Sequence, residues 1–168
     1  AYVGDSIVVS GGAFAPWERG ITVIFDDRTI VAEGVTADEE GCWEAFFDLP
    51  PSSYGSHGVA AYGEVTKAVE VTEAILSTRP KVGLNPGAGG VGSSVSLSGE
   101  GFSSNEVLTV NYDGTIVLEG MSTDGDGSFV VSFRVPSSYS GGHTVTASDA
   151  GGASDSATFT VESVPPPT

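Results

Sequence analysis

The sequence is poor in cysteine, methionine and basic residues: it has one Cys, one Met and six Lys and Arg among 168 residues. A single cysteine, Cys42, excludes an intrachain disulfide and a thiolate metal cluster. The 22 acidic residues give a formal net charge of −16, and this charge argues against nucleic acid and anionic lipid surfaces as partners. No apolar run approaches the roughly 18 residues of a membrane helix, so we expect no direct membrane insertion.

Glycine is abundant, with 24 residues, whereas leucine is scarce beside valine, serine and threonine. Helical bundles and coiled coils need runs of Ala, Leu, Glu, Lys and Arg, so this composition disfavours both. The composition favours short strands joined by glycine-containing turns.

The chain contains two copies of one sequence repeat. Residues 3–14 match residues 91–102 at an offset of 88, with 6 of 12 positions identical, and residues 29–50 match 115–136 at an offset of 86, with 9 of 22 identical. Two shorter blocks follow in the same order, 55–61 with 141–147 and 67–72 with 157–162. Four blocks in one order predict a tandem duplication.

Alternating apolar and polar residues predict short strands in each copy, and strands separated by turns at intervals of 8–12 residues are typical of a β-sandwich. The sequence therefore predicts an all-β protein made of two tandem immunoglobulin-like β-sandwich domains. In the first copy we expect four inward-facing rows: Ile21, Val23 and Phe25; Trp43, Ala45, Phe47 and Leu49; Val59 and Ala61; and Val69 and Val71. Their counterparts in the second copy are Leu108, Val110 and Tyr112; Phe129, Val131, Phe133 and Val135; Val145 and Ala147; and Phe159 and Val161.

The expected domains are residues 1–74 for the first repeat and 75–163 for the second, followed by a Pro-rich linker at 164–168. The second copy opens with Pro80–Pro86, which we expect to form its first strand. The first copy has only Ala1 and Tyr2 before its first matching residue, so its first strand is missing.

Two interpretations of the missing strand stay open. If Ala1 is the mature N-terminus, the sandwich around Ile7–Ser10 and Ile21–Asp26 has an uncovered edge. A partner subunit would then donate the strand by β-strand addition, for example from a tail beginning at Val161. Alternatively, the sequence is a piece of a longer chain whose preceding residues supply the strand.

The second copy contains Pro86-x-x-Gly-x-x-Gly92-x-x-Val-x-Leu-Ser-Gly-x-Gly-Phe102, which resembles the opening of IPT/TIG-type immunoglobulin-like domains. The block Thr123-Asp-Gly-Asp-Gly-Ser-Phe129 and the strands after it look like the Ig-like repeats of large bacterial and archaeal surface proteins. The resemblance implies a role as a stalk, an adhesin repeat or a component of a surface layer or sheath. These families share no catalytic residue, and the first copy lacks the Asn-Pro-x-x-Gly opening.

The acidic turns are candidate calcium sites, because calcium takes oxygen ligands from carboxylates and loop carbonyls. In the second copy the candidates are Asp124 and Asp126, with Asp113 on another loop, and in the first copy they are Asp26 and Asp38 with their acidic neighbours. The alternative is that tight turns simply require Asp and Gly. No other cofactor is expected.

Trp17 lies in a loop flanked by Pro and Gly and has no aromatic counterpart in the second copy. It either stacks on a sugar or anchors a neighbouring protein, or it packs over the open end of the sandwich. His57 and His143 occupy equivalent positions in different copies, so they cannot form one ligand pair, and a structural role is the better interpretation.

These features predict a non-catalytic, extracellular structural or adhesive module of a cell-surface protein. Its expected partners are neighbouring modules or other copies of itself, in a filament, sheath or surface layer, together with surface glycans or proteins. The alternatives are a carbohydrate- or protein-binding module that uses loop aromatics such as Trp17, and an accessory domain of a larger extracellular enzyme.

Overall fold

The computed structural model describes residues 1–67 and 73–164. All of their regular elements are β-strands, and no helix that could cross a membrane occurs among them. The predicted all-β fold is confirmed. The chain divides into two compact units, the first built mainly from Val3–Pro50 and Gly55–Thr78 and the second starting mainly at Arg79.

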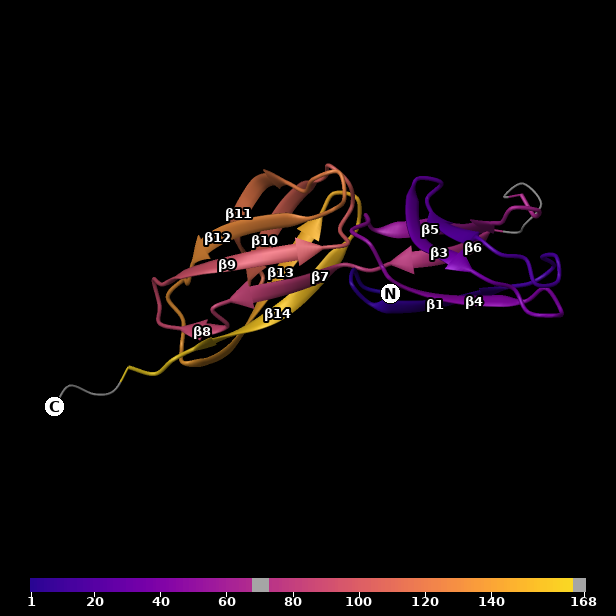
Figure 1. Ribbon diagram of the computed structural model, residues 1–168. Helices are drawn as coiled ribbons and strands as arrows, with labels where there is room; N and C mark the ends of the chain where they lie inside the picture. Colours follow the sequence, from indigo (N-terminus) through magenta and orange to yellow (C-terminus); the bar gives the residue numbers. More distant parts are fainter. Residues whose placement is uncertain (68–72, 165–168) are drawn as a thin grey trace. The chain divides into compact units, whose positions relative to one another are not determined.

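The described part of the first unit forms two antiparallel sheets (Figure 1), one with the order β1–β4 and one with the order β3–β2–β5–β6. Its strands are β1 (Ser6–Gly11), β2 (Ile21–Phe25), β3 (Thr29–Val35), β4 (Trp43–Asp48), β5 (Gly55–Tyr62) and β6 (Ala74–Thr78).

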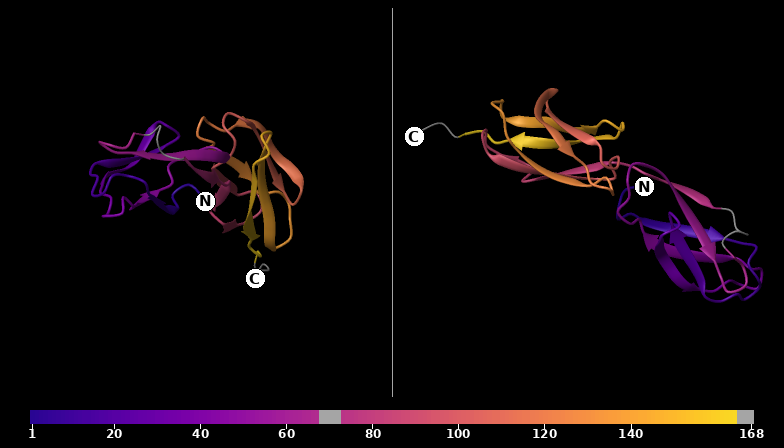
Figure 2. Two further views of the ribbon diagram at one scale, coloured as in Figure 1. Left: turned by 90° about the vertical axis from the view of Figure 1, so that its right-hand side faces the viewer. Right: turned by 90° about the horizontal axis from the view of Figure 1, so that it is seen from above.

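The second unit has the same sheets with two additional strands, and Figure 2 shows its two layers. One sheet has the order β12–β9–β7 and the other β11–β10–β13–β14–β8. The strands are β7 (Lys81–Asn85), β8 (Ala88–Gly89), β9 (Ser94–Glu100), β10 (Val107–Tyr112), β11 (Thr115–Ser122), β12 (Phe129–Arg134), β13 (Gly141–Asp149) and β14 (Ser154–Val161).

The period-2 patterns in the sequence explain the strands and the core between the sheets. In both β4 and β12, every second residue is buried and the others are exposed. The hairpins β2–β3 and β10–β11 turn at Asp26-Asp27 and Asp113-Gly114, where both residues have positive φ angles between 49° and 83°. Two consecutive positive φ angles characterise a type I′ turn, which matches the twist of a β-hairpin.

The last strand of the first unit differs from the sequence prediction. We expected Val69 and Val71 to form the inward row equivalent to Phe159 and Val161, but both lie outside the described residues. β6 takes that place: His57 pairs with Leu76, as His143 pairs with Phe159. The first unit extends to Thr78, four residues past the expected boundary after residue 74, and Ala74–Thr78 is paired with β5.

The first unit lacks a counterpart of β7 among its described residues. In the second unit β9 lies between β12 and β7, whereas its equivalent β1 pairs only with β4. The expected open edge is thus β1 alone; β2 is not part of it, because β2 lies between β3 and β5.

The part of the first core beside β1 is less covered than its equivalent in the second unit. Val95 and Leu97 of β9 are fully buried, at 0% exposure, and Leu97 is paired with Leu84 of β7. The equivalent residues of β1, Ile7 and Val9, are only partly buried.

Candidate functional site

An open groove of about 700 Å³ lies on the first unit where the end of β1 meets the start of β4. Trp17, Asp38 and Cys42 line it together with Ser10, Thr36 and Glu44. We call it the Trp17 groove. It combines one aromatic face with several hydroxyl and carboxylate groups, and these are the groups with which proteins hold sugars and peptides.

Trp17 is 63% exposed, so it does not pack over the end of the sandwich, which was one of its two expected roles. Its backbone has a φ of 60°, a left-handed conformation that bulky side chains rarely adopt. The Trp17 amide donates to the Asp38 carbonyl at 2.9 Å, as the Asn105 amide donates to Asp124 at 2.9 Å in the second unit. Asn105 also has a positive φ, of 54°. A strained, exposed tryptophan therefore stands where the other copy has a residue suited to the turn.

A second, apolar cavity of about 300 Å³ lies between β1 and the β5–β6 pair. Its lining includes Val9, Gly11, Phe14, Trp43, Ala61 and Ala74. We call it the β1 cavity. The equivalent place in the second unit receives β7, whose Val82 and Leu84 pack against the core.

The indole of Trp43 borders this cavity and is 7% exposed. Its Nε1 is buried, and no hydrogen-bond acceptor for it is present in the described part of the chain. An unsatisfied buried donor costs about 1–3 kcal/mol, so native structures rarely leave one without a compensating partner.

Glu18 is a buried carboxylate that ties two loop segments together, its own and that of Val65 and Thr66. Its oxygens accept hydrogen bonds from the amides of Ala15, Val65 and Thr66 and from the Thr66 hydroxyl, at 2.7–3.0 Å. Burial acts to raise the pKa of Glu18, but these hydrogen bonds outweigh it and lower the pKa to about 2. The carboxylate is therefore a permanent structural anion, fully occupied by donors.

The two histidines each pair with the aspartate of a hairpin turn. His57 Nδ1 lies 2.6 Å from Asp26 Oδ2, and His143 Nδ1 lies 2.6 Å from Asp113 Oδ2. In both units the imidazole also stacks on the aromatic residue before the aspartate, with ring centroids 5.1 Å apart. The arrangement fastens the β2–β3 turn to β5 and the β10–β11 turn to β13.

His143 has oxygen acceptors at both ring nitrogens, because Nε2 lies 2.7 Å from the Tyr139 carbonyl. The hydrogen bond to Asp113, followed by that to Tyr139, raises the pKa of His143 above its ordinary value. The same contact with His143 and the Thr144 amide lower the pKa of Asp113. A histidine that donates from both nitrogens cannot accept a proton from a nucleophile, so the pair is not arranged for acyl transfer.

Asp38 and Asp124 organise equivalent turns with their side chains. Asp38 Oδ1 accepts from the amides of Glu40 and Cys42 at 2.9 and 2.8 Å. Asp124 Oδ1 accepts from the amides of Asp126 and Ser128 at 3.0 and 2.8 Å. These are Asx-type turns, in which a short acidic side chain satisfies backbone donors.

The structure does not bring the calcium candidates together. Asp113 precedes β11 and Asp124 follows it, so a strand of eight residues, on the order of 25 Å, separates them. Asp26 and Asp38 are likewise at opposite ends of β3. No group of three or more potential metal ligands occurs among residues 1–67 and 73–164. Calcium binding stays a prediction, which now concerns single turns only.

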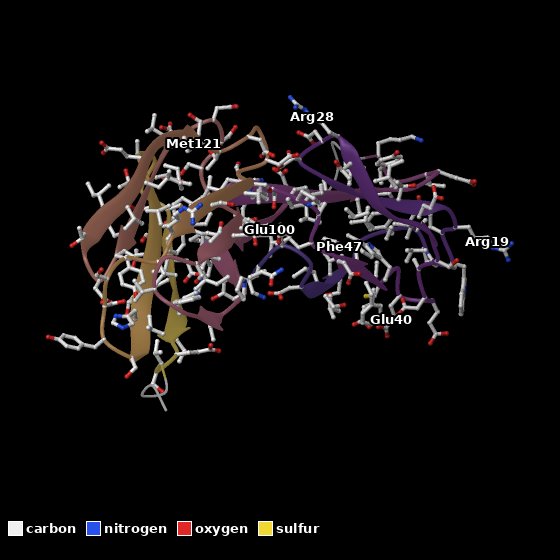
Figure 3. The ribbon with its side chains drawn as sticks, turned by 90° about the vertical axis from the view of Figure 1, so that its left-hand side faces the viewer. Arg19, Arg28, Glu40, Phe47, Glu100 and Met121 are labelled. Carbon is white, nitrogen blue, oxygen red and sulfur yellow. The ribbon has the colours of Figure 1, made fainter. Side chains whose placement is uncertain are left out.

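The described linings of the Trp17 groove and of the β1 cavity include no basic residue. The exposed Arg19 and Arg28 extend away from the ribbon (Figure 3). The Trp17 groove carries the carboxylates of Asp38 and Glu44, so it favours neutral or cationic ligands over anions.

The Asp–His pairs and the Glu18 anchor were not predicted from the sequence. The pairs had a signal: Phe25-Asp26 and Tyr112-Asp113 are followed by a histidine 31 and 30 residues after the aspartate. Glu18 had none, because Val65 and Thr66, which hold its carboxylate, lie outside the matched blocks of the two copies.

No family model and no curated protein matches the sequence. Among solved structures, the chain is similar to the Yersinia pseudotuberculosis adhesin InvE, with 14% identity and a TM-score of 0.40 over 96% of this chain and 56% of that one. It is also similar to a tetra-tandem repeat from the extending region of a large adhesion protein, with 20% identity and a TM-score of 0.39 over 95% and 49%. A third is the Bacteroides ovatus protein SGBP-B in complex with a mixed-linkage heptasaccharide, with 12% identity and a TM-score of 0.39 over 96% and 43%.

The chain thus spans about half the length of these structures. The fold assignment rests on the strand pairing itself: one sheet of β7, β9 and β12 faces a sheet centred on β10 and β13, and the first unit repeats this pattern without β7 and β8. The chain is a tandem pair of immunoglobulin-like β-sandwich units.

Proposed function

We propose that the chain is a non-catalytic structural or adhesive module of a cell-surface protein that joins a neighbour by β-strand addition at β1. The observation that carries the proposal is the difference between the two copies. β9 is covered on both sides, whereas β1 has a partner only in β4 among the described strands. An edge strand with free N–H and C=O groups is a template for a strand from elsewhere.

Strand addition of this kind is directional. The acceptor edge is on the first unit, so a donor strand carried by a neighbouring molecule would make a head-to-tail contact. Such contacts do not close on themselves unless the rotation forms a ring, and they build filaments, sheaths or layers.

Two further features support a passive surface role. The Asp–His pairs and Glu18 are engaged by structural partners, so the titratable groups with shifted pKa values have no free proton-transfer position. The resemblance of the repeats to those of surface proteins, together with the net charge of −16, supports a location outside the cell, where mutual repulsion keeps such chains apart.

Hydrogen exchange of the strand amides, combined with a measurement of mass in solution, tests the proposal. The outward amides of β1 should exchange at least tenfold faster than those of β9, and they should become protected when a donor strand is added. The covered strand β9 is the internal control. A monodisperse monomer whose β1 amides stay unprotected with every donor would contradict the proposal.

Carbohydrate binding is the second candidate, and the strained Trp17 at an open groove favours it. A glycan array with the wild type and Trp17→Ala tests this function. Specific binding that the variant loses would support it, while equal signals from both proteins would exclude a role for Trp17.

A further inference from the structure

The β1 cavity shows which side chains an incoming strand needs. In the second unit, cross-strand neighbours form rows that run through the sheet. Val82, Gly99 and Phe129 form one row, and Leu84, Leu97 and Val131 form the next. The equivalent rows in the first unit are Gly11 with Trp43 and Val9 with Ala45, and each lacks its third member among the described residues.

The rows fix the direction of the missing side chains. Cross-strand neighbours project from the same face of a sheet, and Phe129 and Leu97 are buried between the sheets. A residue placed opposite Gly11 therefore points into the β1 cavity beside the Trp43 indole. A residue two positions further along, opposite Val9, points into the same cavity.

The position opposite Gly11 lies beside the indole N–H of Trp43, which needs a hydrogen-bond acceptor. The equivalent position in the second unit has no such need. An ideal Cβ on Gly11 would lie only 2.7 Å from the indole ring, so the ring covers Gly11 closely, as Phe129 covers Gly99. Phenylalanine has no N–H, whereas Trp43 Nε1 is buried without an acceptor in the described residues. An incoming side chain with an oxygen would satisfy it.

We propose that the β1 edge and its cavity accept an extended strand of a partner chain that carries a small side chain with a hydroxyl or carbonyl oxygen opposite Gly11 and a large aliphatic side chain opposite Val9. This inference rests on the strand addition proposed above and specifies its ligand. The second unit supports a strand as the occupant, because β7 fills the equivalent place and its Val82 amide is held by Asp155 at 2.8 Å.

Synthetic peptides based on residues 80–90 test the proposal, because their strand Lys81–Asn85 is the known partner of β9. One peptide keeps the sequence, one carries Val82→Thr and one carries Leu84→Asp. The Trp43 and Trp17 indole N–H signals are followed by NMR in the intact protein. We expect the Trp43 signal to shift on binding while the Trp17 signal stays unchanged.

The affinity of each peptide should depend on the residue that it places opposite Gly11 and on the residue that it places opposite Val9. The Leu84→Asp peptide should bind at least tenfold more weakly than the parent, because a charge would enter an apolar cavity. The Val82→Thr peptide should bind about three- to tenfold more tightly than the parent, the range expected for one satisfied buried donor. With the Trp43→Phe variant, which has the residue of the second copy, this advantage should disappear.

Ala74→Phe and Ile75→Phe form a matched pair on β6. Ala74 lines the cavity, while Ile75 is 68% exposed on the other face, so only Ala74→Phe should abolish peptide binding. Protection of β1 by all three peptides alike would leave strand addition intact and overturn the proposed specificity. Absence of binding by every peptide would contradict both proposals. Self-association that shifts the Trp43 signal without peptide would identify a second copy as the occupant and overturn the assignment to a partner chain.

Discussion

His143 Nδ1 lies 2.6 Å from Asp113 Oδ2, and its Nε2 lies 2.7 Å from the Tyr139 carbonyl, so both ring nitrogens face an oxygen acceptor that favours the protonated imidazole. The pKa of His143 is raised above 6.5 in the folded protein. Its contribution to the stability of the second unit is therefore fully present below about pH 6.5 and is lost as the pH rises through the raised value. Asp113 gives the stability of the second unit the opposite pH dependence. Because its pKa is lowered, the folded state loses stability as the pH falls below 3.8.

We predict that the second unit unfolds at lower denaturant concentration at pH 9 than at pH 6, and that His143→Gln removes most of this difference. Denaturation curves at the two pH values, read from signals of the second unit, provide the measurement. An NMR titration of His143 with a midpoint at or below 6.5 would contradict the assignment.

We predict that the first unit loses stability in acid because Glu18 becomes protonated. Its pKa is lowered from 4.5 to about 2, so its stabilisation is complete above about pH 5 and is lost as the pH falls toward 2. Glu18→Gln should destabilise the first unit at pH 7, because one amide hydrogen of the new side chain would face a backbone donor. The variant should also reduce the pH dependence between 5 and 2.

Glu106→Gln is the matched control for this experiment, since Glu106 takes the equivalent position in the second unit but is only partly buried. Thermal unfolding at several pH values distinguishes the two variants. Equal effects of both would show that the hydrogen bonds around Glu18 do not anchor the loop.

We predict that the exposed Trp17 lowers the stability of the first unit. Replacing it with Asn, the residue of the second copy, should raise the free energy of unfolding by up to about 1 kcal/mol, because Asn tolerates the left-handed backbone better. Equilibrium denaturation measures this gain. A loss of stability in Trp17→Asn would indicate that the exposed ring packs more strongly than its 63% exposure suggests.

Because β1 is uncovered on one side, substitutions at equivalent core positions of β1 and β9 should differ in their cost to stability. Leu97→Ala should cost about 2–5 kcal/mol, as is typical of a fully buried leucine, whereas Val9→Ala should cost about 1 kcal/mol because Val9 is only partly buried. A bound donor strand should increase the cost at Val9. Urea unfolding with and without the peptide of residues 80–90 measures both effects, and an equal cost at the two positions without peptide would argue against an open edge.

Calcium at the acidic turns remains a prediction, now restricted to local sites such as the turn of Asp124 and Asp126. A ligand at a hundredfold excess over its Kd stabilises the native state by about 2.7 kcal/mol, so binding should raise the melting temperature in millimolar calcium. A melting curve identical in calcium and in chelator, at fixed ionic strength, would exclude such sites.

Much of the fold could be predicted because it depends on local patterns that occur twice. The rows around Val23 and Phe47 and the acidic turns have period-2 or turn signals that the second copy repeats. The last strand of the first unit was misplaced because Val69 and Val71 alternate with polar residues, whereas Ala74–Thr78 does not alternate and is identified as a strand only by its pairing with β5.

The candidate site was less predictable, because burial and hydrogen bonding depend on contacts distant in sequence. Trp17 was identified from its loop, but its backbone conformation was not. The buried Nε1 of Trp43 has no acceptor among residues 1–67 and 73–164, and two of the three amides that hold Glu18 come from residues 47 and 48 positions away.

The parallel pairing of β8 with β14 bears on how the second unit responds to mechanical force. The Thr160 amide donates to the Gly87 carbonyl and the Glu162 amide to the Gly89 carbonyl, at 3.0 and 2.9 Å. β8 is near the start of the unit and β14 near its end, so tension along the chain pulls these parallel strands in opposite directions. Their hydrogen bonds are then loaded in shear and must rupture together, whereas bonds pulled apart at one end of a hairpin open one at a time. In the first unit, the Ala1 amino group donates to the Ser77 carbonyl, but no parallel strand pair occurs among the described residues. Under load, the unit with the open edge would therefore extend first, unless an added strand restores the clamp.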